Sequence, residues 1–429
     1  MARSAVAQEE IRRFLDIGAV QVAELDIDGE DAVLRPGPGS PPLTHGEVFV
    51  LVRWGGRPVG TLLGRVPEGA DARAVLVERA RAECAPALAE EPWQEPPFTS
   101  VVVATRERAG QLARALDSLL AQDHPRFEIV VVDNAPVTSR TRELVERKYA
   151  ERVRYVCEPV PGLASAHNAG LDAVRGEVVA FTDDDVVADL RWLTELTAPF
   201  AADAGLGCST GLILPARLTT PAQVLLESHG GFAKGFTPRT YDPAHPPGDE
   251  PLFPFTAGRF GSGANMAFRT AVLREVGGFD PATGAGTAAR GGDDLYGFVR
   301  VLAEGHRLRY TPYALVWHHH RETWRDLETQ AYGYGAGLTA YLTAVLVNRP
   351  ALLPAFLARL PRGLRHARAL TAVRATEGAD GGGTPGDHDV RTHPWPRRLS
   401  RLQRRGMAYG PVGYLKARRA LRATARGAR

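Results

Sequence analysis

The chain has 429 residues, and its 52 lysines and arginines against 49 aspartates and glutamates give a formal net charge of +3. This length predicts two or three folding units, and the nearly neutral balance gives no reason to expect a nucleic acid as partner. Three cysteines without paired spacing support neither a disulfide framework nor a cysteine zinc site. Acidic residues precede any apolar run at the start of the sequence, which is unlike a secretory signal, so a cytoplasmic location is expected.

Residues 1–95 are predicted to form a small α+β module. Strand-like or helical patterns lie at 19–25, 48–54, 58–63 and 70–88. The two middle runs flank Gly55-Gly56, which indicates a hairpin. No catalytic grouping stands out in this module. The proline- and acid-rich stretch Glu90–Pro97 marks the expected boundary with a larger domain over 96–345.

From residue 98 the pattern changes to apolar strands that alternate with amphipathic helices. The expected strands are 98–104, 127–133, 153–156 and the run that begins at 178, and the expected helices are 110–122, 138–149 and 164–174. Alternation of this kind predicts mainly parallel pairing with right-handed crossovers, and the continuous valine and isoleucine runs fit strands buried on both faces. The predicted fold class is therefore α/β, with a mainly parallel sheet.

Polar side chains follow three of these strands, at the edge where ligands of open α/β sheets bind. They are Thr105–Arg108, Asp133-Asn134 and Asp183-Asp184-Asp185. Adjacent carboxylates repel one another, and a cation, basic side chains or protonation must offset that repulsion. Each group also has a structural alternative: a helix-entry loop, an Asx turn and a helix N-terminus, respectively.

The order of these motifs resembles the family 2 glycosyltransferases, which have the GT-A fold. The resemblance covers about residues 98 to 340 and includes Gly162–Gly170 and Phe181–Asp185. It implies a nucleotide-sugar donor and a metal ion, for which hard oxygen ligands suit Mn²⁺ or Mg²⁺. The metal ligands implied are Asp183 and Asp185. The nucleotide-sugar contacts implied are Thr105, Arg106, Asp133, Asn168, Asp183 and Asp184.

Two later motifs complete the predicted site. The pair Asp293-Asp294 stands where the family has an acidic pair, which implies that Asp294 is the general base, with Asp293 beside it; capping of the following helix is the alternative. In the run His318-His319-His320, alternating directions in extended chain allow at most two rings to face one site. The resemblance implies one histidine ligand to the metal or the diphosphate, and His318 is preferred over His320. A solvated loop is the alternative.

Residues 346–429 are expected to be helical and rich in arginine, with a glycine-rich linker at 378–389. The stretch 332–347 is uncharged, and Asn348, Arg349 and Pro350 interrupt it before it reaches the length that spans a bilayer. A packed helix is one interpretation, and a helix that lies on the inner face of a membrane beside the basic region is the other.

These observations predict a metal-dependent glycosyltransferase that moves a sugar from a nucleotide sugar, with a UDP-sugar as the expected donor. Inversion at the anomeric carbon is implied by the resemblance and is consistent with a single base. The acceptor is a hydroxyl of a glycan, a lipid-linked molecule or a small molecule. A nucleotidyltransferase acting on a sugar phosphate and a non-catalytic carbohydrate- or nucleotide-binding protein remain as alternatives. The first of these normally has a glycine-rich phosphate loop after its first strand, which Thr105–Gly110 does not supply.

Overall fold

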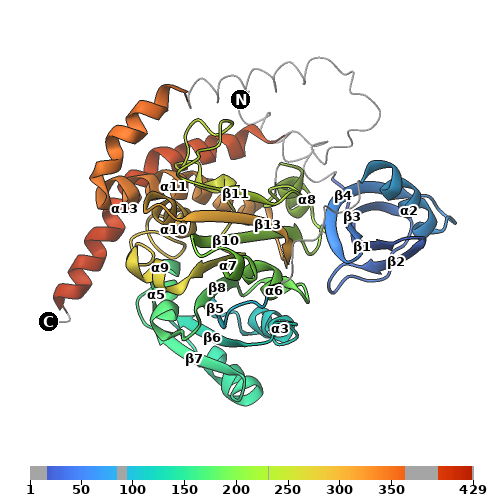
Figure 1. Cartoon of the computed structure of the whole chain (residues 1–429), viewed down its shortest axis with the longest axis horizontal. Coiled ribbons are helices and arrows are strands. Elements are labelled where there is room, and N and C mark those ends of the chain that lie inside the picture. The colour runs from blue at the N-terminus through green and yellow to red at the C-terminus, as the bar shows by residue number, and fades with distance from the viewer. Residues whose placement is uncertain (1–16, 85–93, 230, 363–394, 428–429) are drawn as a thin grey trace, which may run out of the picture.

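The protein contains two β-sheets of different size (Figure 1). The computed structural model describes residues 17–84, 94–229, 231–362 and 395–427. The smaller sheet has the order β2-β1-β3-β4. Its strands are β1 (Gln21–Asp28), β2 (Asp31–Pro36), β3 (Gly46–Trp54) and β4 (Arg57–Val66), and helix α2 (Ala72–Glu83) follows them. The hairpin predicted at Gly55-Gly56 joins β3 and β4, while β2 is not predicted by the sequence pattern. Part of the predicted boundary Glu90–Pro97 lies outside the described residues.

The larger sheet has the order β11-β13-β10-β12-β8-β5-β6-β7, and β9 pairs with β13. The bounds are β5 (Thr99–Thr105), β6 (Phe127–Asn134), β7 (Val153–Glu158), β8 (Val178–Asp183), β9 (Val186–Ala188), β10 (Leu206–Pro215), β11 (Arg239–Tyr241), β12 (Met266–Arg269) and β13 (Arg307–His318). β8, β5, β6 and β7 run parallel to one another, as do β10 and β13, whereas β12 runs antiparallel between β8 and β10. The predicted α/β class with a mixed, mainly parallel sheet is confirmed.

Helices cover both faces of this sheet. They are α3 (Ala109–Leu119), α4 (Arg140–Leu144), α5 (Leu163–Ala173), α6 (Trp192–Thr197), α7 (Pro199–Ala202), α8 (Pro221–Ser228), α9 (Thr270–Glu275), α10 (Asp293–Ala303), α11 (Trp324–Asn348) and α13 (Arg397–Gly427). The helix expected over 138–149 is α4 followed by one π-helical turn, η1 (Val145–Tyr149). Two short 3₁₀ turns are η2 (Ala257–Arg259) and η3 (Pro350–Leu352).

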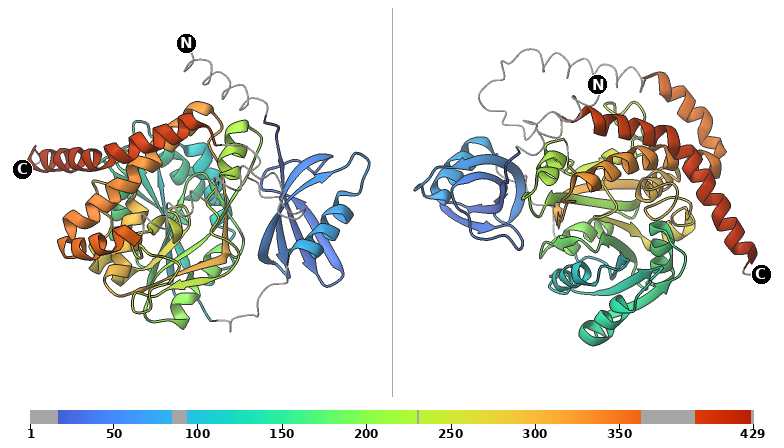
Figure 2. Two further views of the ribbon diagram at one scale, coloured as in Figure 1. Left: turned by 90° about the horizontal axis from the view of Figure 1, so that it is seen from above. Right: turned by 180° about the vertical axis from the view of Figure 1, so that it is seen from behind.

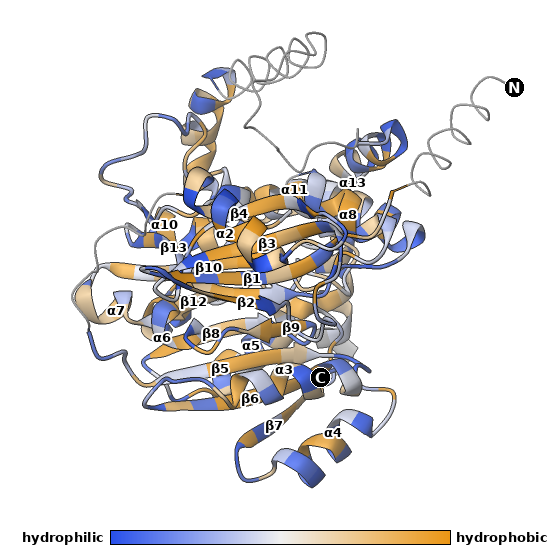
Figure 3. Cartoon of the chain, turned by 90° about the vertical axis from the view of Figure 1, so that its right-hand side faces the viewer, coloured by the Kyte–Doolittle hydropathy of each residue, from blue (hydrophilic) through white to orange (hydrophobic). Residues whose placement is uncertain are grey.

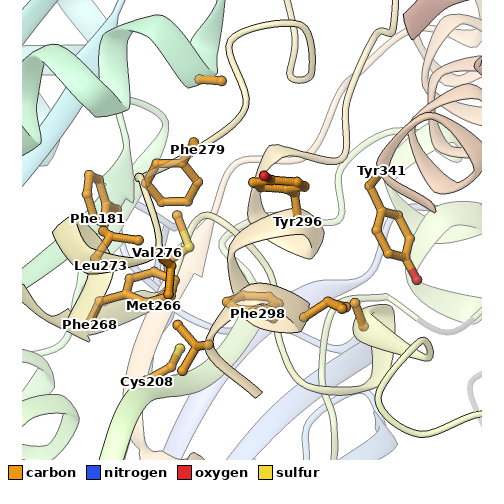
Figure 4. Packing of buried hydrophobic residues seen from close by; sticks show 14 of the residues in the cluster. Phe181, Cys208, Met266, Phe268, Leu273, Val276, Phe279, Tyr296, Phe298 and Tyr341 are labelled. Atoms are coloured by element: carbon orange, nitrogen blue, oxygen red, sulfur yellow. The ribbon is translucent and has the colours of Figure 1, made fainter. Parts of the chain in front are cut away.

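The central strands bury both of their faces, because successive side chains point in opposite directions. On β5, Val101 and Val103 pack toward α3 and α6, while Val102 belongs to the cluster on the side of α5 and α10. Phe181 of β8 stands in that second cluster with the rings of Phe268, Phe279 and Phe298 (Figure 4). Figure 3 shows hydrophobic residues, coloured orange, along β3 and β5. This packing fixes the strand ends from which the site is built.

The small sheet lies against one side of the larger domain, and the end of α13 lies on the opposite side (Figure 2). The contact between the sheets is partly ionic. Arg53 of β3 donates to Glu24 of β1 at 2.9 Å and to Asp189 of the larger domain at 2.6 Å, and its side chain is only 9% exposed. Arg217 also donates to the carbonyl of Gly39 at 2.5 Å. The module is therefore tied to the segment that begins at Asp183.

The C-terminal part is built on two long helices, α11 and α13, which pack closely on each other. Glycines allow this approach, since a Cβ at Gly335 or Gly406 would overlap backbone atoms of the opposite helix. The packed helix is the interpretation of residues 332–347 that the structure supports, because Gly335, Ala336, Ala340, Tyr341 and Ala344 are buried. The linker predicted at 378–389 lies outside the described residues.

Candidate active site

The three aspartates lie at the end of the buried central strand β8, where a cleft of about 890 Å³ opens. All three line this cleft, and so do Thr105, Arg106 and His318. The neighbouring parallel strand β5 ends at Thr105, so that residues about eighty positions apart meet at one edge of the sheet. The structure thus brings together most of the residues that the sequence predicts for a site.

The middle aspartate, Asp184, is turned toward the protein. Its carboxylate accepts a hydrogen bond from Thr105 Oγ1 at 2.6 Å and another from Arg108 Nη1 at 3.0 Å, and the residue is 4% exposed. Burial nevertheless raises the pKa of Asp184, against the lowering effect of Arg108 and Thr105. Part of the repulsion between the aspartates is therefore offset by an arginine. The sequence motifs did not single out Arg108, and its place in the loop after the first strand is the signal that points to it.

Asp183 and Asp185 face a common point together with His318. One ligand atom from each of the three lies within 4.8 Å of the others. Burial and the neighbouring Asp185 raise the pKa of Asp183 to about 7. Although burial opposes them, His318 and Arg108 hold the pKa of Asp185 well below its usual range. His318 Nε2 lies 3.3 Å from Asp185 Oδ1, and despite burial this carboxylate raises the pKa of His318.

This set of atoms fits a divalent cation. The two carboxylates are ordinary ligands of Mn²⁺ and Mg²⁺, the imidazole is a ligand of transition-metal ions, and the set leaves coordination positions open for other oxygens. Burial and the charge of Asp185 both disfavour the ionised form of Asp183, and a bound cation would oppose both effects.

A chain of buried polar groups behind the cluster supports the histidine. His318 Nδ1 lies 3.0 Å from His320 Nδ1, and His320 Nε2 lies 3.1 Å from a carboxylate oxygen of Glu227 on α8. Both rings are buried and pack against Phe232. In extended chain, residues i and i+2 point to the same side, which puts both rings in one row and turns His319 away. Glu227 fixes His320, and His320 in turn fixes the orientation of His318.

The acidic pair stands at the start of α10, and its two members face different ways. Asp294 accepts hydrogen bonds from the backbone N–H of Gly263 at 2.9 Å and of Leu295 at 2.8 Å. Asp294 is not among the residues that line the cleft, but its partner Gly263 lies between two that do, Ser262 and Ala264. Removal from water and the charge of Asp293 raise the pKa of Asp294 to about 6. A carboxylate tuned in this direction suits a general base near neutral pH.

Asp293 points inward, with 4% of its surface exposed. One of its carboxylate oxygens lies 3.1 Å from Nδ1 of His167 on α5, which is itself buried between Phe181 and Phe279. Neither aspartate is the N-cap of α10, because that position is Gly292 in a left-handed conformation without a side-chain cap. The pair thus consists of an inner residue that fixes the helix start and an outer residue beside the cleft.

Two predicted nucleotide contacts are not brought to the cleft lining. Asp133 is fully buried, accepts a hydrogen bond from the hydroxyl of Tyr155 at 2.9 Å and has its pKa raised by burial. Asn168 uses its side-chain amide on the backbone of Phe279, with 2.8 and 2.9 Å contacts. Asn134, next to Asp133, does line the cleft, and its Oδ1 accepts a hydrogen bond from the N–H of Gly162 at 2.9 Å. The nucleotide-binding roles of Asp133 and Asn168 stay predictions.

A further cavity of about 540 Å³ adjoins Asp185 on the side of the N-terminal module. Pro38 and Gly39 of that module line it, together with Arg114, Arg217 and His319. Burial, Arg114 and Arg217 lower the pKa of His319 to about 4. Asp189, which Arg53 binds, follows Asp185 by four residues, so the module contacts this short segment at Asp189 and shares the lining of the cavity with Asp185.

Fold and site together define an α/β domain with a candidate cation site and a separate candidate base at one cleft. Residues 100–277 match the family model described as Glycosyl transferase family 2. This part of the chain is therefore a family 2 glycosyltransferase domain, as the sequence motifs predicted.

Curated relatives agree with this assignment. Pre-mycofactocin glycosyltransferase of Mycobacterium tuberculosis (strain ATCC 25618 / H37Rv) is 28% identical over 242 residues, which are 55% of this chain and 46% of the relative. Validoxylamine A glucosyltransferase of Streptomyces hygroscopicus subsp. jinggangensis (strain 5008) is 36% identical over 125 residues, 27% of this chain and 29% of the relative. The chain therefore spans less than half the length of these relatives.

Among solved structures, mannosyltransferase PcManGT from Pyrobaculum calidifontis, in complex with GDP-Man and Mn²⁺, is similar with a TM-score of 0.46 and 20% identity, over 75% of this chain and 91% of that chain. GalNAc-T7 with UDP, GalNAc and Mn²⁺ gives a TM-score of 0.41 and 18% identity, over 57% of this chain and 50% of that chain.

Proposed function

We propose that this protein transfers a sugar from a nucleotide sugar to an acceptor hydroxyl, with metal dependence and inversion at the anomeric carbon. The observation that carries the proposal is the division of labour at the cleft: Asp183, Asp185 and His318 form one cluster, and Asp294 stands apart from it with a raised pKa of about 6. The family match favours glycosyl transfer over the nucleotidyltransferase alternative. A UDP-sugar remains the expected donor, and the cytoplasmic location predicted from the sequence stays a prediction.

The chemistry follows from that division. The acceptor oxygen attacks the anomeric carbon while Asp294 takes its proton, and the bond from that carbon to the nucleoside diphosphate breaks, with the electron pair leaving on the diphosphate. Attack from the face opposite the leaving group inverts the configuration. Asp183, Asp185 and His318 would hold a divalent cation, whose positive charge would stabilise the departing diphosphate.

The surrounding residues position these groups. Thr105 and Arg108 hold Asp184, which keeps the strand end in a fixed conformation, and His320 with Glu227 orients His318. The N–H of Gly263 and of Leu295 direct the carboxylate of Asp294. Thr105, Glu227 and His318 stand on β5, α8 and β13, and Asp294 stands on α10, so regular elements carry part of each set and help to keep the two carboxylate groups apart.

The test is release of nucleoside diphosphate from a panel of UDP- and GDP-sugars, with Mn²⁺, Mg²⁺ or a chelator. We expect release with one donor class and only with metal. Asp294→Asn should lower turnover by about 10²- to 10⁴-fold. It should leave intact the rise in thermal unfolding temperature that Mn²⁺ binding causes. Asp185→Asn should abolish both. Asp172→Asn, an exposed aspartate on α5, is the matched control and should retain both.

Two outcomes would refute the proposal. Full turnover of the Asp294→Asn variant at saturating donor would remove the base assignment. Unchanged turnover in the presence of chelator would show that the reaction needs no metal. The cluster of Asp183, Asp185 and His318 is the only group of this kind among the described residues, so a metal requirement points to it.

A further inference from the structure

The last helix is the most strongly charged part of the chain. Over Arg397–Gly427, α13 contains nine arginines, one lysine and no acidic residue. The whole chain has a net charge of +3, so the remainder carries −7. The net positive charge of the chain therefore comes from this helix, because the acidic residues outnumber the basic ones in the remainder.

The two sides of α13 differ sharply in burial. Leu399, Tyr414 and Ala417 are buried, and Gly406 and Gly410 face α11 at backbone contact. On the opposite side, positions at helical spacing form one exposed stripe. This stripe, here called the outer face, consists of Arg401, Arg405, Ala408, Val412, Leu415, Arg419 and Arg422. Measured along the helix at 1.5 Å per residue it is about 30 Å long, and Pro411 lies within this stretch.

The outer face is basic at both ends and apolar in the middle. Val412 is 48% exposed and Leu415 is 45% exposed, although each is large and hydrophobic. In the part of the chain that the structure describes, the four arginines of this face make no ion pair, whereas Arg398, outside it, pairs with Glu328. Exposed apolar side chains also mark the helical residues 353–362, where Leu353 is 43% and Leu357 is 53% exposed.

We propose that the outer face of α13 docks on a membrane surface that contains anionic lipids. The arginines at the two ends meet lipid phosphates and carboxylates, while Val412 and Leu415 enter the interface between headgroups and acyl chains. In Figure 2 the end of α13 extends beyond the domain, which leaves this part of the helix accessible to a flat surface.

This contact is peripheral. None of the helices in the described ranges is by itself long and apolar enough to cross a membrane, and α11 with residues 350–362 qualifies only as a pair bent by 110°. Attraction falls off within about one Debye length, near 8 Å at physiological salt, so the helix must lie on the surface rather than near it.

A nucleic acid is the other polyanion that a basic helix can meet, and the outer face favours lipid. Phosphate contacts need the arginines alone, and a charged sugar-phosphate backbone offers no apolar surface on which the two large apolar side chains in the middle of the stripe could pack. In a lipid interface the same two side chains bury their apolar surface, which adds to the electrostatic attraction.

The test is sedimentation of the full-length protein with vesicles. One set contains phosphatidylcholine with about 30% phosphatidylserine, and the other contains phosphatidylcholine only. The test variant is R401Q/R405Q/R419Q/R422Q, and the matched control is R35Q/R65Q/R73Q/R147Q, which removes the same charge from exposed arginines on other elements. Circular dichroism of each variant checks that the fold is retained.

We expect the wild type to bind the anionic vesicles at least tenfold more strongly than the neutral ones, with binding weakened by salt. Each arginine near an anionic surface contributes about fivefold, so the test variant should lose more than tenfold and the control less than twofold. V412S/L415S should reduce the binding that remains at high salt.

Three results would overturn the proposal. The first is equal binding to neutral and anionic vesicles. The second is the same loss in the test variant and in the control. The third is binding of a DNA duplex at a salt concentration at which the vesicles are not bound, which would make a nucleic acid the partner of this face.

Discussion

Binding of a divalent cation at Asp183, Asp185 and His318 should compete with a proton on Asp183. Burial and the charge of Asp185 raise the pKa of Asp183 to about 7, so this carboxyl is about half protonated at neutral pH. A metal ligand must be ionised, and binding therefore releases this proton. Metal affinity consequently falls as the pH falls through 7. His318, whose pKa is also raised, must lose a proton as well and acts in the same direction.

The size of the effect follows from the fraction of ionised Asp183. With a pKa of about 7, that fraction is about 0.9 at pH 8 and about 0.1 at pH 6. The apparent Kd for Mn²⁺ should therefore rise about tenfold between pH 8 and pH 6, which corresponds to about 1.4 kcal/mol of binding free energy. Participation of His318 makes this a lower bound.

Isothermal titration of Mn²⁺ at pH 6, 7 and 8, in buffers of different ionisation enthalpy, measures both the affinity and the number of protons released. Asp183→Asn should bind metal weakly and with a smaller pH dependence. Asp184→Asn is the matched control and should keep the pH dependence, because Asp184 bonds to Thr105 and Arg108 and is not in the three-ligand cluster. An affinity that is the same at pH 6 and pH 8, with no proton released, would refute this reasoning.

Three further outcomes are expected. Because the ionised form of Asp294 is the base, kcat/KM measured at saturating Mn²⁺ should rise with pH and level off above about pH 6, in a pH-rate profile with the active donor. His320→Ala should weaken Mn²⁺ binding about 10- to 100-fold by releasing His318, as measured by titration. Arg53→Met should lower the free energy of unfolding, measured in urea, by on the order of 3 kcal/mol, because Glu24 and Asp189 then lose their shared counter-ion.

Each of these has a control. The profile near pH 6 should disappear in Asp294→Asn, and a profile that persists there belongs to another group. His245→Ala, an exposed histidine, should leave metal binding unchanged. Arg65→Met removes an exposed pair with Glu47 and should change the free energy of unfolding by less than about 1 kcal/mol; a loss equal to that of Arg53→Met would show that the interface pair has no special role.

Much of the larger domain can be predicted from the sequence, because its pattern is local. Strands buried on both faces appear as unbroken apolar runs, and the residues after them must lie at one edge of a parallel sheet. This is why the order of the motifs alone predicts that Thr105 and Asp183–Asp185 lie together. Strands β2, β9, β10, β11 and β12 are not predicted, although β10 is ten residues long and buried throughout. β12 is only four residues long and follows a glycine-rich turn that has no strand pattern of its own.

The directions of individual side chains depend on tertiary contacts. Asp184 turns inward because Thr105 and Arg108, from a different strand end, bind its carboxylate. Asn168 is engaged by the backbone of Phe279, more than a hundred residues away. No pattern within a short stretch of sequence can encode such pairings, because they arise only when distant segments pack.

The aspartates, the acidic pair and the histidine run, with their order along the chain, were determined by the sequence alone, and so was the alternation that puts His318 and His320 on one side. The tertiary structure decided which carboxylates gather around one point, that Asp294 rather than Asp293 binds the backbone of the segment at the cleft, and that the N-terminal module is held to the aspartate segment through Arg53. The physical reason is that charge and polarity are properties of residues, whereas proximity and burial, which set the pKa of each group, are properties of the packed chain.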